Sequence, residues 1–353
     1  MTRTGSDAAV TDYTYDKNNR LLNETAVAGN TTYTTDYSYD PNGNTLIKTK
    51  GEIEPASNIP SETFLSSQYA EIYTYDLYGR MTSAMMNDSS AAYAYNANGM
   101  RKSKTVNGVK TNHVWDGMNI IAEADANNAM KSKYYRGRGS EILSRYTSDD
   151  VIIDYYFYNG RGDVAQITDG YTPKQIQKML AGTIPKDMRY DMNGNGELDI
   201  MDARNYATTY KYIYYGRDGF GNEWAPANPL AMDVNPFRFN SEYFDQETGL
   251  YYQRARYYDP LTSRWLSPDS YWNPSNMIYG DSPGNPPVPD ITAILQSSNL
   301  YAFCLNNPLR WTDPSGLKVK GEVIGIGSGS FIDVRRMQTF LNEQGYVGTV
   351  SVN

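Results

Sequence analysis

The sequence predicts a mainly β fold, organised as a strip of tyrosine-rich hairpins. Three observations predict it. Tyrosine dominates the aromatic residues, with 33 Tyr against 9 Phe, a Tyr-x-Tyr-Asp unit recurs, and aromatic residues concentrate in the late stretch 235–270. Abundant Tyr, Thr, Gly and Asn are typical of strands and turns. A small helical insertion and a short helix near the end of the sequence complete the predicted fold.

The repeated unit occupies residues 1–171. Its copies begin at Tyr13, Tyr37, Tyr73 and Tyr93, and a divergent copy begins at His113. In Tyr-x-Tyr both rings lie on one face of a strand, where they can pack against the next hairpin. The Asp or Asn that follows opens a turn, and a later glycine, such as Gly43, allows a positive φ. One such hairpin cannot bury its face alone, so the copies are expected to pack side by side.

These units resemble YD repeats, which wind as a strip of hairpins into a hollow shell. The four or five units present would form only part of a shell. The resemblance therefore implies the C-terminal part of a larger wrapping protein. Taken alone, the repeats also fit an ordinary antiparallel sheet protein.

Residues 172–210 interrupt this pattern with a helical period. Thr172 and Pro173 are typical of a helix start, Met179 lies on its apolar face, and Gly182 is a plausible stop. The segment that follows has the spacing of a 12-residue calcium loop. The predicted metal ligands are Asp191, Asn193, Asn195, Glu197 through its backbone carbonyl, Asp199 and Asp202.

Two further positions support this interpretation, since Gly196 lies where such a loop bends sharply and Leu198 lies where it points inward. The loop resembles an EF-hand, and with its final Asp it resembles one calcium repeat of a dockerin. Calcium is therefore the predicted cofactor. A dockerin has two repeats and only one is found, so binding of a cohesin stays open. The other interpretation is a turn rich in Asn and Gly with scattered acids.

Residues 211–317 contain the last repeat and the dense aromatic stretch. Short strands separated by tight turns are predicted there, and alternation places Tyr252, Arg254 and Arg256 on one face. Two arginines on one face need carboxylates, aromatic rings or water as partners.

The motifs of this region occur in the order of the Rhs-repeat-associated core, which caps Rhs and YD-repeat proteins. They are Asn-Pro-Phe-Arg-Phe from 235, Glu-Thr-Gly-Leu-Tyr-Tyr from 247, Arg-Ala-Arg-Tyr-Tyr-Asp-Pro from 254, Arg-Trp-Leu-Ser-Pro-Asp from 264 and Asp-Pro-Ser-Gly-Leu from 313. The resemblance implies a structural encapsulation module of a polymorphic-toxin-like protein, which holds a C-terminal cargo segment.

The segment from Pro308 to Leu317 resembles the motif after which some of these proteins cut themselves. The resemblance implies Asp313 and Asp269 as the carboxylate pair and the Leu317–Lys318 peptide bond as the scissile bond. Two close carboxylates share a proton, so one can activate water while the other protonates the leaving amide. The chain would then be at most a single-turnover aspartyl autoprotease.

Three points of this hypothesis stay open. Arg256 or Arg264 is expected to position one carboxylate, and Asp290 is a substitute for Asp269. Asp-Pro and Pro-Ser-Gly are also ordinary turn sequences, so an uncut chain is the other interpretation.

Residues 318–353 form a variable tail, interpreted as a cargo remnant or the start of a peptidoglycan-binding-like segment. A helix is predicted at 332–344, with Val334, Met337 and Phe340 on one face. Some 15 residues there resemble the first helix of small peptidoglycan-binding domains. Neither a histidine nuclease site nor a hydrolase triad can be built from this tail, and His113, the single histidine, is interpreted as structural.

Composition limits the function further. A net charge of −8 argues against a nucleic-acid or anionic-membrane surface. The single cysteine, Cys304, excludes an internal disulfide framework. The sequence lacks an apolar run of about 18 residues, so no membrane span is expected. No signal peptide is visible at the start, which says nothing about export if the chain is a fragment.

The expected setting is a bacterial protein that is secreted or on the cell surface. Its expected partners are its own C-terminal cargo segment and the upstream part of the shell, while an immunity protein or a cell-wall or cohesin-type partner stays open. The alternative function is a secreted surface adhesion or scaffold protein with a calcium-dependent docking element.

Overall fold

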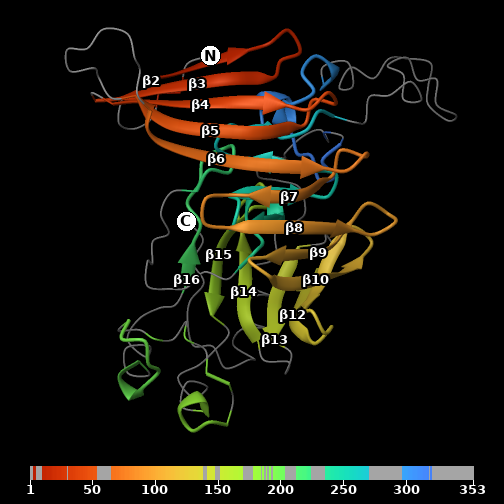
Figure 1. The fold of residues 1–353 in the computed structure, drawn as a ribbon. Coiled ribbons are helices and arrows are strands. Elements are labelled where there is room, and N and C mark those ends of the chain that lie inside the picture. The colour runs from red at the N-terminus through yellow and green to blue at the C-terminus, as the bar shows by residue number, and fades with distance from the viewer. Residues whose placement is uncertain are drawn as a thin grey trace, which may run out of the picture.

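A computed structural model of the chain shows a mainly β fold, as the sequence predicts (Figure 1). It describes residues 3–4, 10–29, 31–53, 65–137, 141–147, 152–169, 178–183, 185–186, 188, 191, 194–202, 212–223, 235–269, 296–317 and 319. The predicted helix at 332–344 and most of the tail lie outside these residues.

One antiparallel sheet of 16 strands contains all the repeats, and each strand pairs with its neighbours in the chain. Its strands are β1 (Arg3–Thr4), β2 (Val10–Tyr15), β3 (Leu21–Ala28), β4 (Thr31–Tyr39), β5 (Thr45–Ile53), β6 (Leu65–Tyr75), β7 (Met81–Met85), β8 (Ser90–Tyr95), β9 (Arg101–Val106), β10 (Val109–Asp116), β11 (Asn119–Ala124), β12 (Met130–Arg136), β13 (Ile142–Thr147), β14 (Ile152–Tyr158), β15 (Val164–Asp169) and β16 (Tyr212–Tyr214). Figure 1 shows the strip turning along its length, so that β2–β6 lie across the top and β13–β16 stand roughly upright below them.

A recurring turn connects successive strands of the strip. In the copy at Asp76, the side-chain Oδ1 accepts hydrogen bonds from the backbone N–H groups of Tyr78 at 2.9 Å and Arg80 at 3.0 Å. Gly79 lies between them with a φ of +73°, a conformation that costs glycine little. The same bond to the residue four positions on is made by Asp16, Asp40, Asn96, Asp125, Asn159 and Asp218. The turn at Asp125 was not predicted, because no Tyr-x-Tyr precedes it.

In the copies at Tyr37 and Tyr93, the second tyrosine of the unit bonds its hairpin to the strand before it. Tyr39 donates its hydroxyl hydrogen to the carbonyl of Leu21 at 2.7 Å, and Tyr95 donates to the carbonyl of Met81 at 2.6 Å. Both acceptors are the first residues of their strands, β3 and β7. These bonds hold the register of neighbouring strands, because a slip of one residue would move the tyrosine to the other face.

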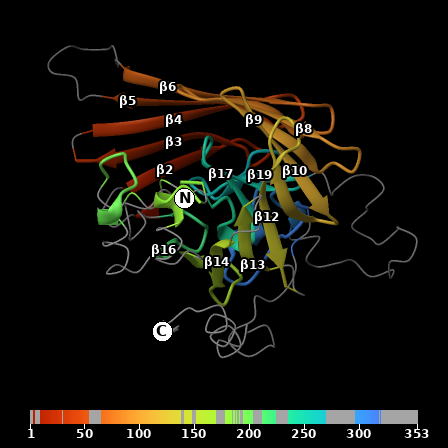
Figure 2. The same ribbon diagram turned by 90° about the horizontal axis from the view of Figure 1, so that it is seen from below.

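A second, four-stranded antiparallel sheet lies inside the curve of the first (Figure 2). It consists of β17 (Tyr243–Asp245), β18 (Leu250–Gln253), β19 (Arg256–Asp259) and β20 (Arg264–Trp265), flanked by the 3-10 turns η2 (Phe239–Ser241) and η3 (Phe303–Asn306). We call this sheet the plug. One face of the plug packs on the curved sheet through Tyr243, Tyr252 and Tyr257, and the opposite face packs on Phe303 and Cys304.

The alternation predicted through 252–256 is wrong in one respect. Tyr252 pairs with Tyr257, so the chain reverses at Arg254 and Ala255 instead of continuing as one strand. Arg254 adopts a φ of +57° at this reversal. Alternation cannot be counted across a turn, and nothing in the local sequence marks an arginine as the residue with positive φ.

Buried ion pairs join the plug to the curved sheet. Arg101 of β9 is fully buried. Both of its terminal nitrogens donate hydrogen bonds to the carboxylate of Asp245, and the bond from Nη2 is 3.1 Å long. Its guanidinium also lies 4.3 Å from the ring centre of Tyr252. Further along the strip, the ammonium of Lys48 contacts Asp259 at 2.6 Å. Since isolated buried charges are very costly, each pair fixes where the plug sits.

Replacing Arg101 with Met is expected to destabilise the fold by about 3 to 5 kcal/mol, because Asp245 would keep its buried charge without its main partner. Urea unfolding followed by tryptophan fluorescence measures this. The matched control is Arg80→Met, whose pair with Asp76 is about a quarter exposed on both sides and should contribute about 1 kcal/mol or less. Equal losses in the two variants would contradict a special role for Arg101.

His113 supplies a second test, because burial and the nearby Arg101 lower the pKa of its imidazole to about 3. The unfolded chain takes up this proton near pH 6.5 while the folded chain does not, so stability falls as the pH drops from about 6.5 to 3. The slope is at most about 1.4 kcal/mol per pH unit. We expect His113→Gln to lose stability less steeply between pH 6 and pH 4 in urea unfolding. Parallel slopes for both proteins would refute the assignment.

Candidate active site at the exit turn

The plug brings the two predicted carboxylates together. Asp269 follows β20, and its backbone N–H donates to the carbonyl of Leu300 at 3.0 Å. Asp313 opens the turn that ends at Leu317, after η3. Both carboxylates contact the same guanidinium nitrogen, Nη2 of Arg256, at 3.2 Å for Asp269 and 3.3 Å for Asp313. All three side chains are buried.

Arg256, rather than Arg264, therefore contacts the carboxylates. The guanidinium of Arg256 stacks on Trp265, with 4.1 Å between the charge centre and the ring centre. Arg264 turns away and donates to the carbonyl of Asn19 in the first repeat. Sequence alone left both arginines open, because the choice depends on which strand face meets the exit turn.

The exit turn, residues 313–317, is held from both sides. Asp313 Oδ1 accepts the backbone N–H of Leu317 at 3.0 Å, and Arg256 Nε donates to the carbonyl of Gly316. Gly316 has a φ of +71°, and a Cβ at this position would lie 2.3 Å from the carbonyl oxygen of Gln253. Only glycine fits there, so the Asp-Pro-x-Gly-Leu spacing is a packing requirement.

Burial and the neighbouring guanidinium act on the carboxyl of Asp313 in opposite directions. Burial raises the pKa of Asp313, although Arg256 opposes the rise. Burial likewise lowers the pKa of Arg256. A carboxyl with a raised pKa that lies beside a second carboxyl is suited to proton donation, and its neighbour to proton acceptance.

One polar residue of the site was missed by sequence reasoning. Gln296 is buried, and its side-chain Nε2 donates to Asp269 Oδ2 at 2.5 Å and to the carbonyl oxygen of Leu317 at 2.6 Å. That carbonyl belongs to the predicted scissile bond. A single glutamine outside any motif carries no sequence signal, so only tertiary packing reveals it.

The predicted calcium loop is described in part. Asp191 accepts the backbone N–H groups of Asn195 at 3.1 Å and Gly196 at 2.7 Å, and Gly196 has a φ of +82°. Leu198 is buried, as predicted for its inward position, and Asp202 is buried at the end of the loop. These features fit a loop that wraps around a cation.

The structure describes all but one of the predicted metal ligands. Asp199 accepts the N–H of Met201 at 2.6 Å, where residues 200–202 are helical. Asn193 lies outside the described residues. Within the described ranges, no group of three or more His, Cys, Asp or Glu residues is arranged to hold a metal. Such a group consists only of His, Cys, Asp and Glu side chains. The predicted ligand set also contains asparagine side-chain oxygens and a backbone carbonyl oxygen.

Several predictions fall on residues that the structure does not describe. Asp290, the substitute for Asp269, is one of them, as is the tail from 320 onward. His113 is described and buried, and its Nδ1 lies 3.2 Å from the carbonyl of Arg101 in the core. That position agrees with a structural role.

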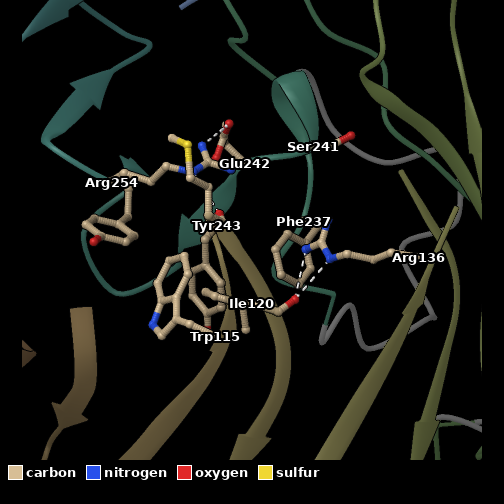
Figure 3. A pocket seen from close by; sticks show the side chains of 10 residues that line it. Trp115, Ile120, Arg136, Phe237, Ser241, Glu242, Tyr243 and Arg254 are labelled. Carbon is tan, nitrogen blue, oxygen red and sulfur yellow. Dashed lines mark hydrogen bonds and ion pairs between the residues drawn. The ribbon is translucent and has the colours of Figure 1, made fainter. Parts of the chain in front are cut away.

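A small pocket lies near the exit turn, between the plug and the curved sheet (Figure 3). Trp115, Phe237 and Tyr243 line it on one side and the pair of Glu242 and Arg254 on the other. Its cavity volume is about 10 Å³, which is roughly the space of one water molecule. This pocket therefore offers no room for a small-molecule substrate.

By sequence, the chain is similar to Rhs/YD-repeat toxin-like proteins, which confirms the coarse prediction from its repeats and core motifs. The tRNA3(Ser)-specific nuclease WapA of Bacillus spizizenii is 30% identical over 249 residues, which cover 69% of this chain and 8% of that protein. Toxin protein Tse5 of Pseudomonas aeruginosa is 33% identical over 108 residues, which cover 30% of this chain and 7% of that protein.

The chain thus spans only about 8% of the length of these curated relatives. No family model matches it. Among solved structures, the Tc holotoxin pore of Photorhabdus luminescens matches 92% of this chain and 16% of that chain, with 16% identity and a TM-score of 0.39. No helix within the described ranges is both long and apolar enough to cross a membrane.

Proposed function

We propose that this chain is the closing end of an encapsulating shell, which holds the segment after Leu317 as cargo and cuts it free. The observation that carries the proposal is the exit turn itself. Asp269, Asp313 and Arg256 meet there in a buried site, next to the peptide bond that follows Leu317. The names of the relatives, a nuclease and a toxin protein, support a role around a toxic C-terminal cargo.

The cleavage is a hydrolysis that needs only water and the two carboxyl groups. Asp269 takes a proton from water as the water oxygen bonds to the carbonyl carbon of Leu317. The bond from that carbon to the nitrogen of Lys318 then breaks, and Asp313 gives its proton to the nitrogen. The products are a carboxyl group on Leu317 and an amine on Lys318. Burial of Asp313 supports its role as the acid.

The buried site restricts the reaction to the protein's own chain. Asp313 lies four residues before Leu317 and bonds its N–H, so the site and its substrate fold as one turn. Proximity of this kind replaces substrate binding. After one cut the substrate bond is gone, which makes the reaction single-turnover.

The wider setting follows from the same proposal. We propose that the chain works as part of a larger bacterial protein, secreted or on the cell surface, and that the upstream part of the shell is its first partner. The calcium loop at 191–202 would stabilise the insertion that precedes the plug. Asp191, Asn193, Asn195, Asp199 and Asp202 would hold the ion by side-chain oxygens, and Glu197 by its carbonyl.

Cleavage is tested by intact mass spectrometry of the purified chain. We expect two fragments that divide after Leu317 and together exceed the mass of the chain by one water. In Asp313→Asn and Asp269→Asn we expect the uncut chain, because each variant removes one member of the acid–base pair.

Asp76→Asn is the matched control, since Asn96 occupies the same turn position in another copy and the fold accepts it. This control should cleave as the parent does. An uncut parent chain after purification and prolonged incubation would refute the proposal.

Calcium binding is tested by thermal unfolding with and without the ion. Binding to the folded state alone stabilises it by about 2.7 kcal/mol when calcium is at 100 times its dissociation constant. We expect calcium to raise the Tm of the Asp313→Asn chain, which stays in one piece, and not that of the same chain with Asp191→Ala and Asp202→Ala. Asp88→Ala removes an exposed acid elsewhere and should keep the response. An Asp313→Asn chain whose Tm is indifferent to calcium would overturn the site.

A further inference from the structure

The geometry points to Gln296 as the donor that holds the scissile carbonyl of Leu317 during cleavage, an inference that rests on the proposed self-cleavage. Its Nε2 lies 2.6 Å from that carbonyl oxygen. This is hydrogen-bonding distance to the atom on which negative charge develops when water adds to the carbonyl carbon. Gln296 therefore touches a reacting atom and would act as a catalytic residue.

The amide of Gln296 pairs with the chain on both sides of the bond to be cut. Besides donating to Leu317, it accepts the backbone N–H of Val319 at its Oε1, at 3.4 Å. One donor and one acceptor, directed at residues two apart, reproduce the pairing of a neighbouring β-strand. The side chain thus holds the backbone at Leu317 and Val319 in the way that a neighbouring strand would.

The second N–H of the same amide links this carbonyl to the carboxylate pair. It donates to Asp269 Oδ2 at 2.5 Å. A glutamine side chain has two N–H donors, and these two acceptors use both of them. One planar group therefore sets the position of Asp269 relative to the carbonyl that its activated water attacks.

Burial makes these bonds strong enough to matter. Gln296 is only 4% exposed, and Asp269 and Asp313 are buried with it. Hydrogen bonds to developing charge are stronger in such a low-dielectric site than in water, and a donor already in place needs no reorganisation. Water addition leaves the charge of the tetrahedral intermediate on the oxygen that Gln296 contacts. Collapse of the intermediate returns it to a carbonyl as the bond to Lys318 breaks.

Contacts with the plug fix the position of Gln296. Residues 296–297 are helical and directly precede the Asn299 segment that pairs with the plug. The backbone of Ala302 bridges Arg264 on β20, so this segment is fixed by sheet contacts just after Gln296. The glutamine is thereby placed by the plug itself.

The test measures the rate of cleavage of the full chain. Chains are labelled by a short pulse of cell-free synthesis, and the fragment that ends at Leu317 is followed over time for the parent and for Gln296→Met. Met keeps a similar length but cannot donate. We expect cleavage to slow by about 100-fold to 1,000-fold, the range for loss of one oxyanion donor. Gln246→Met, an exposed glutamine on the β17–β18 turn, is the matched control and should cleave at the parental rate.

A second variant separates catalysis from folding. Gln296→Glu keeps the acceptor and can donate to Leu317 only when protonated. Its rate relative to the parent should rise as the pH falls, while the ratio for Gln296→Met stays flat. A flat ratio for the Glu variant would contradict the inference even if the Met variant proves unstable. Thermal unfolding of both variants in the uncut Asp313→Asn background reports on folding.

The outcomes distinguish the proposed self-cleavage from the role of Gln296 in it. A parent chain that never cleaves removes the proposed self-cleavage, and this inference with it. A parent that cleaves, together with a folded Gln296→Met that cleaves within about threefold of it, leaves the self-cleavage standing. That second result removes Gln296 alone.

Discussion

The structure depends on one buried charge, the guanidinium of Arg101. Its charge centre lies within 6 Å of four tyrosine rings, those of Tyr93, Tyr243, Tyr252 and Tyr257, and its terminal nitrogens hold Asp245. Arg101 and Tyr93 come from the curved sheet and the other three rings from the plug. A guanidinium out of water needs both its counterion and the electron-rich ring faces. The pair therefore stabilises only the docked arrangement, in which the plug lies inside the strip.

Docking of the plug and assembly of the exit turn are consequences of the same packing. The hairpin of β18 and β19 presents Tyr252 and Tyr257 to Arg101, and Arg256 next to them reaches the carboxylates of the site. Its other face carries Tyr251 and Tyr258 against Phe303, which leads into the exit turn. A single short sheet thus connects the wall of the strip to the bond after Leu317. Loosening the plug would disturb the site even though no wall residue belongs to it.

The hydroxyl hydrogen bonds of the repeats give a physical reason why tyrosine is favoured over phenylalanine there. At Tyr39 and Tyr95 the ring fills space between hairpins, and its hydroxyl also donates to a backbone carbonyl at the start of the preceding strand. Phenylalanine can do the first and not the second. Where the repeat diverges, Trp115 replaces the tyrosine and donates its indole N–H to the carbonyl of Arg101 at 2.9 Å. The donor is kept while the ring changes.

The sequence by itself determined the features that depend on neighbours in the chain. The Asp-led turns and their glycines follow from local backbone geometry, and the pairing of Asp269 with Asp313 followed from the resemblance of their motifs. Only the tertiary structure decided between Arg256 and Arg264, placed Arg254 at a chain reversal, and brought Gln296 to the carbonyl of Leu317. Those outcomes depend on which faces of distant segments meet. These contacts form because aromatic rings and charged groups from distant segments are buried together. The spacing of residues along the sequence does not indicate which segments will pack against each other.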